Sequence, residues 1–338
     1  MSNIGATNLP NHYKSWAISQ KATIMNSFKK GKDYRQGIIY MEQTENVEDR
    51  LTELQGMDNF EVWADGQRAS QTELKEGYRQ TFTQINYGKE LPIGRLAKKF
   101  QMNDARALKI ATKQFGKNAY RIQQKAPFSM LGYGFSDTNT YLTGLNGETV
   151  NAKGPDGKRL FSIAHPNSPD DSTNTWSNAL LDGAEVGEDA LKDMIDNLDV
   201  QTDSKNEKKH WGEEGYIWAV PLQQLAEAKR VCGSELRSSV SDNDVNVYKG
   251  SFDSRPIEVR YIPWLGDFGS TENHYLIAKD AIDEMPLNCF TATPFYTDEY
   301  EDKITKTAYV RGELGFAVGI LSGRGMVGSL GDGVTVVA

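Results

Sequence analysis

A long amphipathic pattern between residues 93 and 126 constrains the fold more than any other feature of the sequence. Apolar residues recur there at spacings of three and four. At about 100° per residue they fall on one face of an α-helix, and they are Leu108, Ala111, Phe115, Ala119, Ile122 and Ala126. Pro127 follows, where we expect the helix to end, and Asn103 or Asp104 offers an internal N-cap. The pattern therefore predicts a long helix that packs one face against a core.

The opposite face of this helix is basic. Positive side chains occupy every fourth position, as Lys109, Lys113, Lys117, Arg121 and Lys125. Like charges at this spacing cost about 0.2–0.5 kcal/mol per pair. The row is therefore either a solvated face or a face that meets an anionic neighbour. That neighbour could be the acidic run of this chain, an adjacent subunit, an assembly partner or DNA. The acidic run consists of Asp298, Glu299, Glu301 and Asp302.

The segment before the helix reads as a β-hairpin. Phe60, Val62 and Trp63 form a strand-like run that stops at Asp65 and Gly66, a typical hairpin turn. Residues 77–87, which include Tyr78, are rich in Thr and aromatic side chains and show no apolar helical face. Because an exposed hairpin is only marginally stable alone, we expect it to lie on another surface, most naturally that of a neighbouring subunit.

The remaining segments alternate helices and strands. Residues 1–55 are polar and weakly periodic, with short helices expected over 14–28 and 47–54, and read as an extended arm with little core. Residues 128–182 are loop-rich. Helices are expected over 183–200 and 222–231, and strands over 216–220, 245–248, 257–262, 274–278, 304–310 and 316–321, before a glycine-rich tail. No repeat of fixed period occurs, and the fold class is α+β.

Composition excludes several classes of protein. The net charge of -8 and a pI of about 5.2 are unlike those of a general nucleic-acid binder. Cys232 and Cys289 are far apart and form no disulfide framework or C-x-x-C pair. The sequence shows neither a signal-peptide pattern nor a run of about 18 apolar residues, so we expect a soluble, cytosolic product without a membrane span.

No catalytic or metal-binding motif stands out. The four histidines lack metal-ligand spacing, and for His165 we expect a structural hydrogen bond. Residues 323–328 match G-x-G-x-x-G, but too few residues follow to build a dinucleotide site. No cofactor is expected. A pair of convergent carboxylates, as in a hydrolase, stays open because spacing alone does not exclude it.

Several short motifs occur in one order along the chain. Gly77-Tyr78 and Tyr87-Gly88 precede the long helix. Residues 157–166 read GKRLFSIAHP, residues 219–228 read AVPLQQLAEA, residues 242–247 read DNDVNV and residues 322–329 read SGRGMVGS. In this order the motifs resemble those of tailed-bacteriophage major capsid proteins, particularly the Mu-like major head subunit family. Ser322-Gly323 stands where that family often has Asp-Pro, and Val327 where it has an aromatic residue.

The resemblance implies the Hong Kong ninety-seven type capsid fold. Residues 1–55 would be the N-terminal arm, 56–92 the extended-loop hairpin, and 93–205 the peripheral domain with its spine helix. Residues 206–290 would be the axial domain, and 291–338 the return strands and tail. The candidate assembly contacts are then Asp65, Gly66, Tyr78, Lys109, Lys113, Lys117, Arg121, Asp298, Glu299, Glu301 and Asp302.

The implied function is structural and not enzymatic. The chain would assemble with itself into hexamers and pentamers of an icosahedral shell that encloses double-stranded DNA without sequence-specific binding. A scaffolding protein, a portal and a decoration protein are the further partners that the resemblance implies, with assembly in the host cytoplasm and residence in the virion. We expect an acidic inner surface that does not retain DNA. The alternatives are a nanocompartment shell of the same fold, the hydrolase above, and a phage tail or baseplate component.

Overall fold

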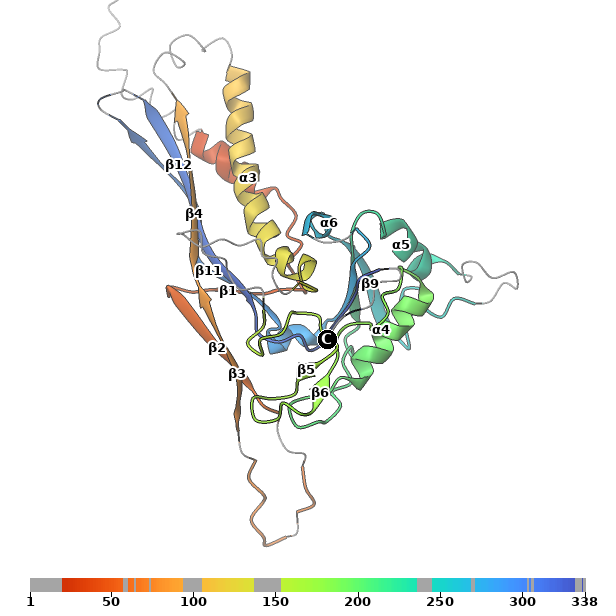
Figure 1. Ribbon diagram of the computed structural model, residues 1–338. Coiled ribbons are helices and arrows are strands. Elements are labelled where there is room, and N and C mark those ends of the chain that lie inside the picture. Colours follow the sequence, from red (N-terminus) through yellow and green to blue (C-terminus); the bar gives the residue numbers. More distant parts are fainter. Residues whose placement is uncertain are drawn as a thin grey trace, which may run out of the picture.

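The computed structural model describes residues 20–56, 60–63, 65–72, 74–93, 105–136, 153–235, 245–268, 271–302, 304, 307–331 and 336. Two larger sheets organise these residues. A long sheet with helix α3 forms an elongated part, and a second sheet with helices α4 and α5 forms a more compact part beside it (Figure 1). The mixed α+β class predicted from the sequence is confirmed.

The long sheet has the order β1-β11-β12-β4. Its members are β1 (Tyr40–Gln43), β4 (Ile85–Ile93), β11 (Leu287–Glu301) and β12 (Ala308–Ile320). β11 and β12 pair antiparallel along 15 and 13 residues, with irregular register between Thr291 and Tyr296. The strands expected over 304–310 and 316–321 are thus one strand, β12, because the glycines between them do not interrupt its pairing with β4.

Helix α3 (Ala105–Gly132) covers one face of this sheet (Figure 1). The predicted apolar face is confirmed for its described side chains: Phe115, Ala119 and Ile122 pack on the main core and Ala126 is fully buried. The predicted end at Pro127 is wrong, since the helix continues for another turn. Phe128, Met130 and Leu131 are buried in that turn, and their packing outweighs the backbone hydrogen bond that proline removes.

Residues 20–43 are packed against the core. A helix over residues 20–29 and strand β1 bring Ile24, Ile38 and Ile39 into the main hydrophobic cluster, each at most 1% exposed. The described part of the helix expected over 14–28 is therefore helical, and the rest lies outside the described residues. β1 pairs parallel with β11, Tyr40 opposite Asn288. The expectation of little core in this segment does not hold for residues 24–39.

The hairpin is built from other strands than those expected. β2 (Glu48–Leu54) pairs antiparallel with β3 (Glu76–Thr83), so the helix predicted over 47–54 is wrong. Residues 60–63 lie in extended coil and form no strand. The strand expected over 77–87 divides at Gln84, because β3 pairs with β2 while β4 pairs with β12.

The second sheet has the order β13-β10-β7-β9-β8. Its members are β7 (Tyr216–Val220), β8 (Ser251–Phe252), β9 (Arg255–Tyr261), β10 (His274–Ala278) and β13 (Met326–Ser329). Every residue of β7 and β10 is buried, because both faces of the sheet are covered. Ile217 and Ile277 face the main core beside α3, while Trp218 and Leu276 face the cluster that includes α4.

Helices α4 (Glu188–Val200) and α5 (Leu225–Gly233) cover the outer face of this sheet. The helix predicted over 183–200 is confirmed for residues 188–200, and one apolar side of it is buried: Ala190, Leu191, Met194, Ile195 and Leu198. The strand predicted over 245–248 is wrong: these residues form a single bridge and a turn, with Val245 at 74% exposure. Asn246 holds the turn through its side-chain amide on the Ser234 carbonyl.

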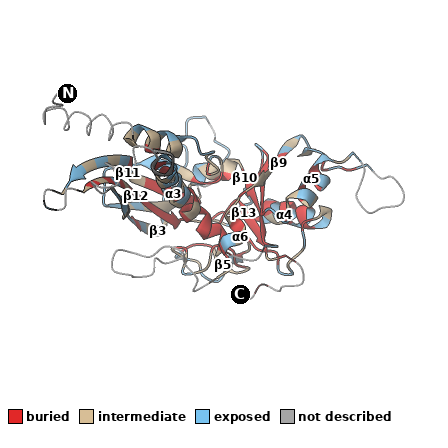
Figure 2. Ribbon diagram, turned by 90° about the horizontal axis from the view of Figure 1, so that it is seen from above, coloured by how far each residue is buried: buried red, intermediate tan, exposed pale blue. Residues whose placement is uncertain are grey.

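The described residues also include several short elements. They are β5 (His165–Pro166), β6 (Thr175–Trp176), α6 (Leu265–Phe268) and the 3-10 helix η2 (Asp280–Glu284). Figure 2 shows the buried residues gathered where β10, β13 and the end of α3 meet. Within the described ranges, no helix has the length and apolar content needed to cross a membrane.

Candidate assembly surfaces

The loop beyond β2 and β3 projects from the body of the chain (Figure 1). Its large apolar side chains are exposed: Phe60 at 108%, Val62 at 104% and Trp63 at 61%. Asp65 and Gly66 form a turn within this loop, with Gly66 at φ +84°, as the hairpin-turn prediction expected. Exposed apolar side chains on a projecting loop are typical of a surface that contacts another chain.

The base of the hairpin is fixed by a buried arginine that sequence reasoning did not single out. Arg324 is 5% exposed. Its Nη1 donates to Glu53 Oε1 of β2 at 2.6 Å, and its Nε donates to the Thr202 carbonyl at 2.9 Å. Its Nη2 donates to the Asn167 carbonyl at 2.8 Å, and the guanidinium lies 4.9 Å from the ring centre of Trp176. One side chain thus joins the hairpin to three other segments.

Burial dominates the electrostatics of this network. Burial raises the pKa of the Glu53 carboxyl even though the Arg324 guanidinium beside it acts in the opposite direction. The pKa of Tyr78 is also raised, by burial first and then by the charges of Asp156 and Glu53. Tyr78, a predicted assembly contact, is half-buried at the base of the hairpin and lines the small cavity beside Arg324. It faces its own chain there.

The same cavity holds the arrangement that most resembles a catalytic pair. His165 Nδ1 lies 2.6 Å from Asp156 Oδ2. Its Nε2, however, lies 3.1 Å from Asn178 Oδ1, and the ring stacks on Trp176 at 4.5 Å. The cavity has a volume of about 20 Å³, room for about one water molecule. The structural hydrogen-bonding role predicted for His165 is confirmed, and the ring faces an amide where a triad would place a nucleophile.

Asn178 connects two of the sequence motifs through its side chain. Its side-chain amide donates to the carbonyls of Leu160 at 2.7 Å and Gly323 at 3.0 Å, while its Oδ1 accepts from the Ser162 backbone N–H at 2.9 Å. It therefore connects the 157–166 motif with the 322–329 motif. The G-x-G-x-x-G match within the second motif forms a turn and strand β13, with no helix following in the described residues. Residues 323–328 thus serve packing.

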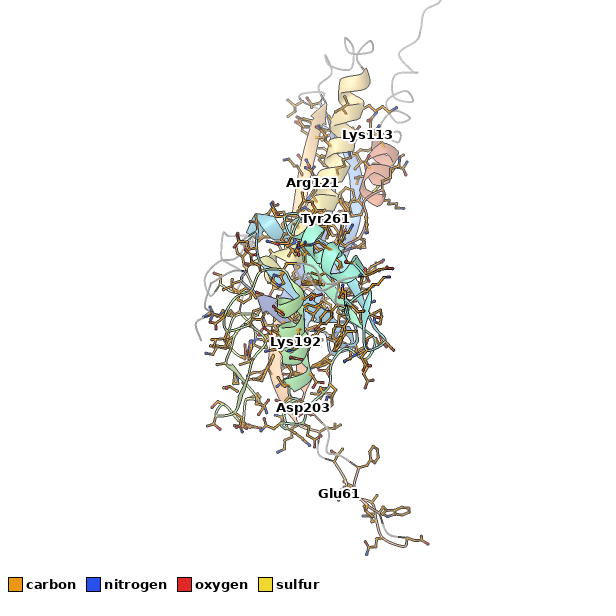
Figure 3. The ribbon with its side chains drawn as sticks, turned by 90° about the vertical axis from the view of Figure 1, so that its right-hand side faces the viewer. Glu61, Lys113, Arg121, Lys192, Asp203 and Tyr261 are labelled. Atoms are coloured by element: carbon orange, nitrogen blue, oxygen red, sulfur yellow. The ribbon has the colours of Figure 1, made fainter. Side chains whose placement is uncertain are left out.

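The basic row of α3 is exposed on the face turned away from the sheet. Lys109, Lys113, Lys117 and Arg121 are all exposed. The last member of the row differs, because Lys125 Nζ pairs with Asp267 at 2.9 Å. Figure 3 labels Lys113 and Arg121 on the upper length of α3.

The acidic run lies at the end of β11 and does not meet this row. Asp298 is 3.6 Å from Lys21 of the 20–29 helix, Glu299 is partly buried, and Glu301 and Asp302 lie at the end of the strand. Among the ion pairs of the described residues, none joins the acidic run to the basic row of α3.

The part of the chain that the structure describes contains no candidate metal-binding site. No group of three or more His, Cys, Asp or Glu side chains is arranged there to hold an ion. Burial raises the pKa of both thiols, that of Cys232 to about 12, so neither cysteine is set up as a nucleophile.

Comparison with known proteins rests on structure alone. No protein-family model and no curated protein sequence matches the chain. The capsid of Ralstonia phage GP4 matches with a TM-score of 0.53 and 10% identity, covering 89% of this chain and 91% of that chain. The capsid of the cyanophage P-SCSP1u matches at 0.52 and 8% identity over 88% and 87%. The capsid of a native GTA particle matches at 0.50 and 8% identity over 88% and 89%.

These likenesses define the class of fold. The chain has the mixed α+β fold of tailed-phage capsid subunits, the Hong Kong ninety-seven type, over about nine-tenths of its length. The fold predicted from the order of the sequence motifs is confirmed.

Proposed function

We propose that this chain is a major capsid protein, a structural subunit that forms the icosahedral shell of a phage-like particle. The observation that carries the proposal is the match to capsid subunits over 89% of this chain and 91% of the matched chain. The shell would be built from hexamers and pentamers through heterologous contacts, in which one surface of a subunit meets a different surface of the next. No catalytic role is part of the proposal.

The projecting loop supports self-assembly on physical grounds. Phe60, Val62 and Trp63 are exposed to solvent in the single chain. Burying one large apolar side chain contributes about 1.5–3 kcal/mol, so covering all three would contribute several kcal/mol per contact, repeated around the shell. We infer that the loop lies on a neighbouring subunit and that Asp65 and Gly66 set its end.

We also propose the finer placement among Mu-like head subunits. It is supported by the roles of the motif residues: Asn178 holds the 157–166 and 322–329 segments together, and Arg324 connects the second of them to the hairpin. These contacts give a physical reason for the two motifs to occur together. The division into an arm (1–55), extended loop (56–92), peripheral domain (93–205 and 291–338) and axial domain (206–290) belongs to the same proposal.

The partners follow from the proposed role. Besides further copies of itself, the subunit would use a scaffolding protein and a portal during assembly and could carry a decoration protein outside. It would be assembled in the host cytoplasm and remain in the virion around double-stranded DNA.

The test is assembly of the purified chain. The wild-type chain and a Phe60→Ser/Val62→Ser/Trp63→Ser variant are compared by size-exclusion chromatography and negative-stain electron microscopy, alone and with the proposed scaffolding protein. The matched control is Leu181→Ser/Leu222→Ser/Val245→Ser, which alters three exposed apolar residues on other surfaces.

We expect closed shells or capsomers from the wild type and control, and dispersed subunits from the loop variant. Tubes would indicate a tail component, and shells filled with a protein cargo would indicate a nanocompartment. A wild-type chain that stays monomeric with its scaffolding protein would refute the capsid proposal.

A further inference from the structure

We propose that the exposed face of α3 and the end of the 20–29 helix contact the phosphate backbone of double-stranded DNA without reading its sequence. The inference rests on the proposed function and adds to it the surface that would line the inside of the shell. It departs from the expectation of an acidic inner surface, and the reason lies in how the charges are placed.

Two segments far apart in the sequence bring their cations together. Tyr120 of α3 donates to the Lys32 carbonyl, and its ring lies 6.5 Å from that of Phe28. Gln124 accepts from the Tyr34 backbone N–H at 3.1 Å, and Gly116 lies directly against the backbone of Ile24. The end of the 20–29 helix therefore lies along the middle of α3. The basic face consists of Lys29, Lys30, Lys32, Lys109, Lys113, Lys117 and Arg121, all exposed.

The fold uses little of this positive charge: Lys32 Nζ lies 5.2 Å from the ring centre of Tyr34, a contact that leaves its charge without an anionic partner. The described ion pairs of the two segments involve Lys21 with Asp298 and Lys125 with Asp267, which lie at the margins of the face. No ion pair between described residues neutralises a member of the basic face itself. A net charge of -8 for the whole chain makes this local concentration of positive charge more pronounced. Repulsion along the row lowers helix stability, which an anionic ligand would relieve.

The composition of the face favours a phosphate backbone over a folded protein. Its other exposed side chains include the amides Gln114 and Asn118. Ile110, at 49% exposure, is the one large apolar side chain exposed among the described side chains of α3. Protein interfaces depend on buried aromatic or aliphatic anchors, which this face lacks. Lysine, arginine, asparagine and glutamine are the side chains that commonly contact phosphates.

The spacing also suits an extended polyanion. Successive cations of the row stand four residues apart, which is a rise of about 6 Å each and about 18 Å from Lys109 to Arg121. One strand of duplex DNA carries a phosphate about every 3.4 Å along its axis. Over about 18 Å one strand presents about five phosphates, and the four cations, which turn about 40° around the helix axis at each step, can meet up to four of them. The contact would be weak in one subunit and repeated in every subunit of a shell.

The experiment measures duplex binding by unassembled full-length subunits. Fluorescence anisotropy of a labelled duplex of about thirty base pairs is followed between about 50 and 200 mM salt. The wild type is compared with Lys109→Gln/Lys113→Gln/Lys117→Gln/Arg121→Gln. The matched control, Lys75→Gln/Lys192→Gln/Lys208→Gln/Lys229→Gln, removes the same charge from exposed positions elsewhere; Lys192, for example, lies on α4 (Figure 3).

We expect weak, salt-sensitive binding by the wild type and the control. The α3 variant should bind about tenfold or more weakly at low salt, and its log–log salt slope should be smaller by about 3.6, since each phosphate contact contributes about 0.9. Equal binding by the α3 variant and the wild type would overturn the inference. So would an equal loss in the control, because diffuse charge would then explain the binding.

A competitor identifies the class of ligand. Poly-glutamate is added at the same total charge as the duplex. If it displaces the duplex, and if its own binding depends equally on the α3 row, the face binds an acidic protein and the DNA inference is overturned. Assembly of the wild type is scored separately by negative stain. Shells without duplex binding would refute this inference alone, and duplex binding without shells would refute the capsid proposal alone.

Discussion

Replacing Arg324 should destabilise the chain more than any exposed substitution. Its buried guanidinium donates to four acceptors: Glu53 Oε1, the Thr202 carbonyl, and the carbonyl and side-chain oxygens of Asn167. In Arg324→Met the carboxylate of Glu53, which is 17% exposed in the native chain, loses its cation, and the carbonyls of Thr202 and Asn167 lose their donors. Breaking a buried ion pair from one side costs about 3–5 kcal/mol. We therefore expect the free energy of unfolding to fall by about 3–5 kcal/mol, a large part of the stability of an ordinary domain.

A double-mutant cycle separates the contribution of the Arg324–Glu53 ion pair from the loss of packing by the arginine side chain. Glu53→Gln keeps an oxygen acceptor and removes the charge, and we expect a cost of about 1–3 kcal/mol. Because the two side chains are in direct contact, the double variant should lose less than the sum, with a coupling energy of about 0.5–3 kcal/mol. Arg230→Met is the control: Arg230 pairs with Glu227 at 2.5 Å on the surface of α5, and its loss should change stability little.

The assay is urea unfolding of dispersed subunits at fixed protein concentration, with hydrogen exchange of β2 and β3 alongside. Loss of Arg324 should also speed exchange in the hairpin, since the Glu53 contact anchors β2. The pKa of Glu53 is raised by burial. In the folded variant Glu53 therefore takes up a proton more readily than it does in the unfolded chain. The loss of unfolding free energy caused by Arg324→Met should thus become smaller as the pH falls. A cost below about 1 kcal/mol, or strict additivity with Glu53→Gln, would refute the reasoning.

Two further predictions concern the core. Burial lowers the pKa of His274 to about 4, so the folded chain keeps this ring neutral while the unfolded chain protonates near pH 6.5. Stability contributed by the neutral ring is then lost as the pH falls from about 6.5 to about 4, by on the order of 3 kcal/mol. His274→Asn should lose this slope in urea titrations at several pH values, and an unchanged slope would contradict the assignment. A Cβ at Gly116 would meet the backbone oxygen of Ile24. Gly116→Ala should cost about 1–3 kcal/mol and make the 20–29 helix more sensitive to limited proteolysis. Gly233→Ala is the control, because no atom lies within 4 Å of a Cβ there. If both variants resist proteolysis of the 20–29 helix equally well, the contact between Gly116 and Ile24 is not tight.

Regular apolar patterns were sufficient to predict the elements whose buried faces can be read from their own residues alone. Helix α4 and strands β7 and β10 were predicted correctly, because one or both faces of each element are buried and apolar. The segment 48–54 was not, since Val47, Leu51 and Leu54 recur at helical spacings of four and three, whereas a strand places Leu54 on the opposite face from the other two. Its pairing with β3 decides the matter, and that partner cannot be inferred from local sequence.

The junction at Arg324 shows the second limit of sequence reasoning. The motif around it was recognised, yet its charged partner Glu53 lies 271 positions away, and no spacing rule links two such residues. The one available signal was that an arginine stands inside a run of small and apolar residues at 322–329, where a buried charge requires a partner. Of the candidate assembly contacts, the row on α3 is exposed and Asp65 and Gly66 form a turn, whereas the half burial of Tyr78 beside the small cavity could not be inferred from its local sequence.

The net charge of the whole chain does not give the charge of any one of its faces. A net charge of -8 sums over every surface, and the expectation of an acidic interior treated that sum as uniform. The helical period separates the charges instead: cations at every fourth position of α3 must share one face, while the acidic run lies at the end of β11. An acidic subunit can therefore present one basic face. In a closed shell many weak, salt-sensitive contacts would act together on the DNA, while each one separates quickly enough for the genome to leave.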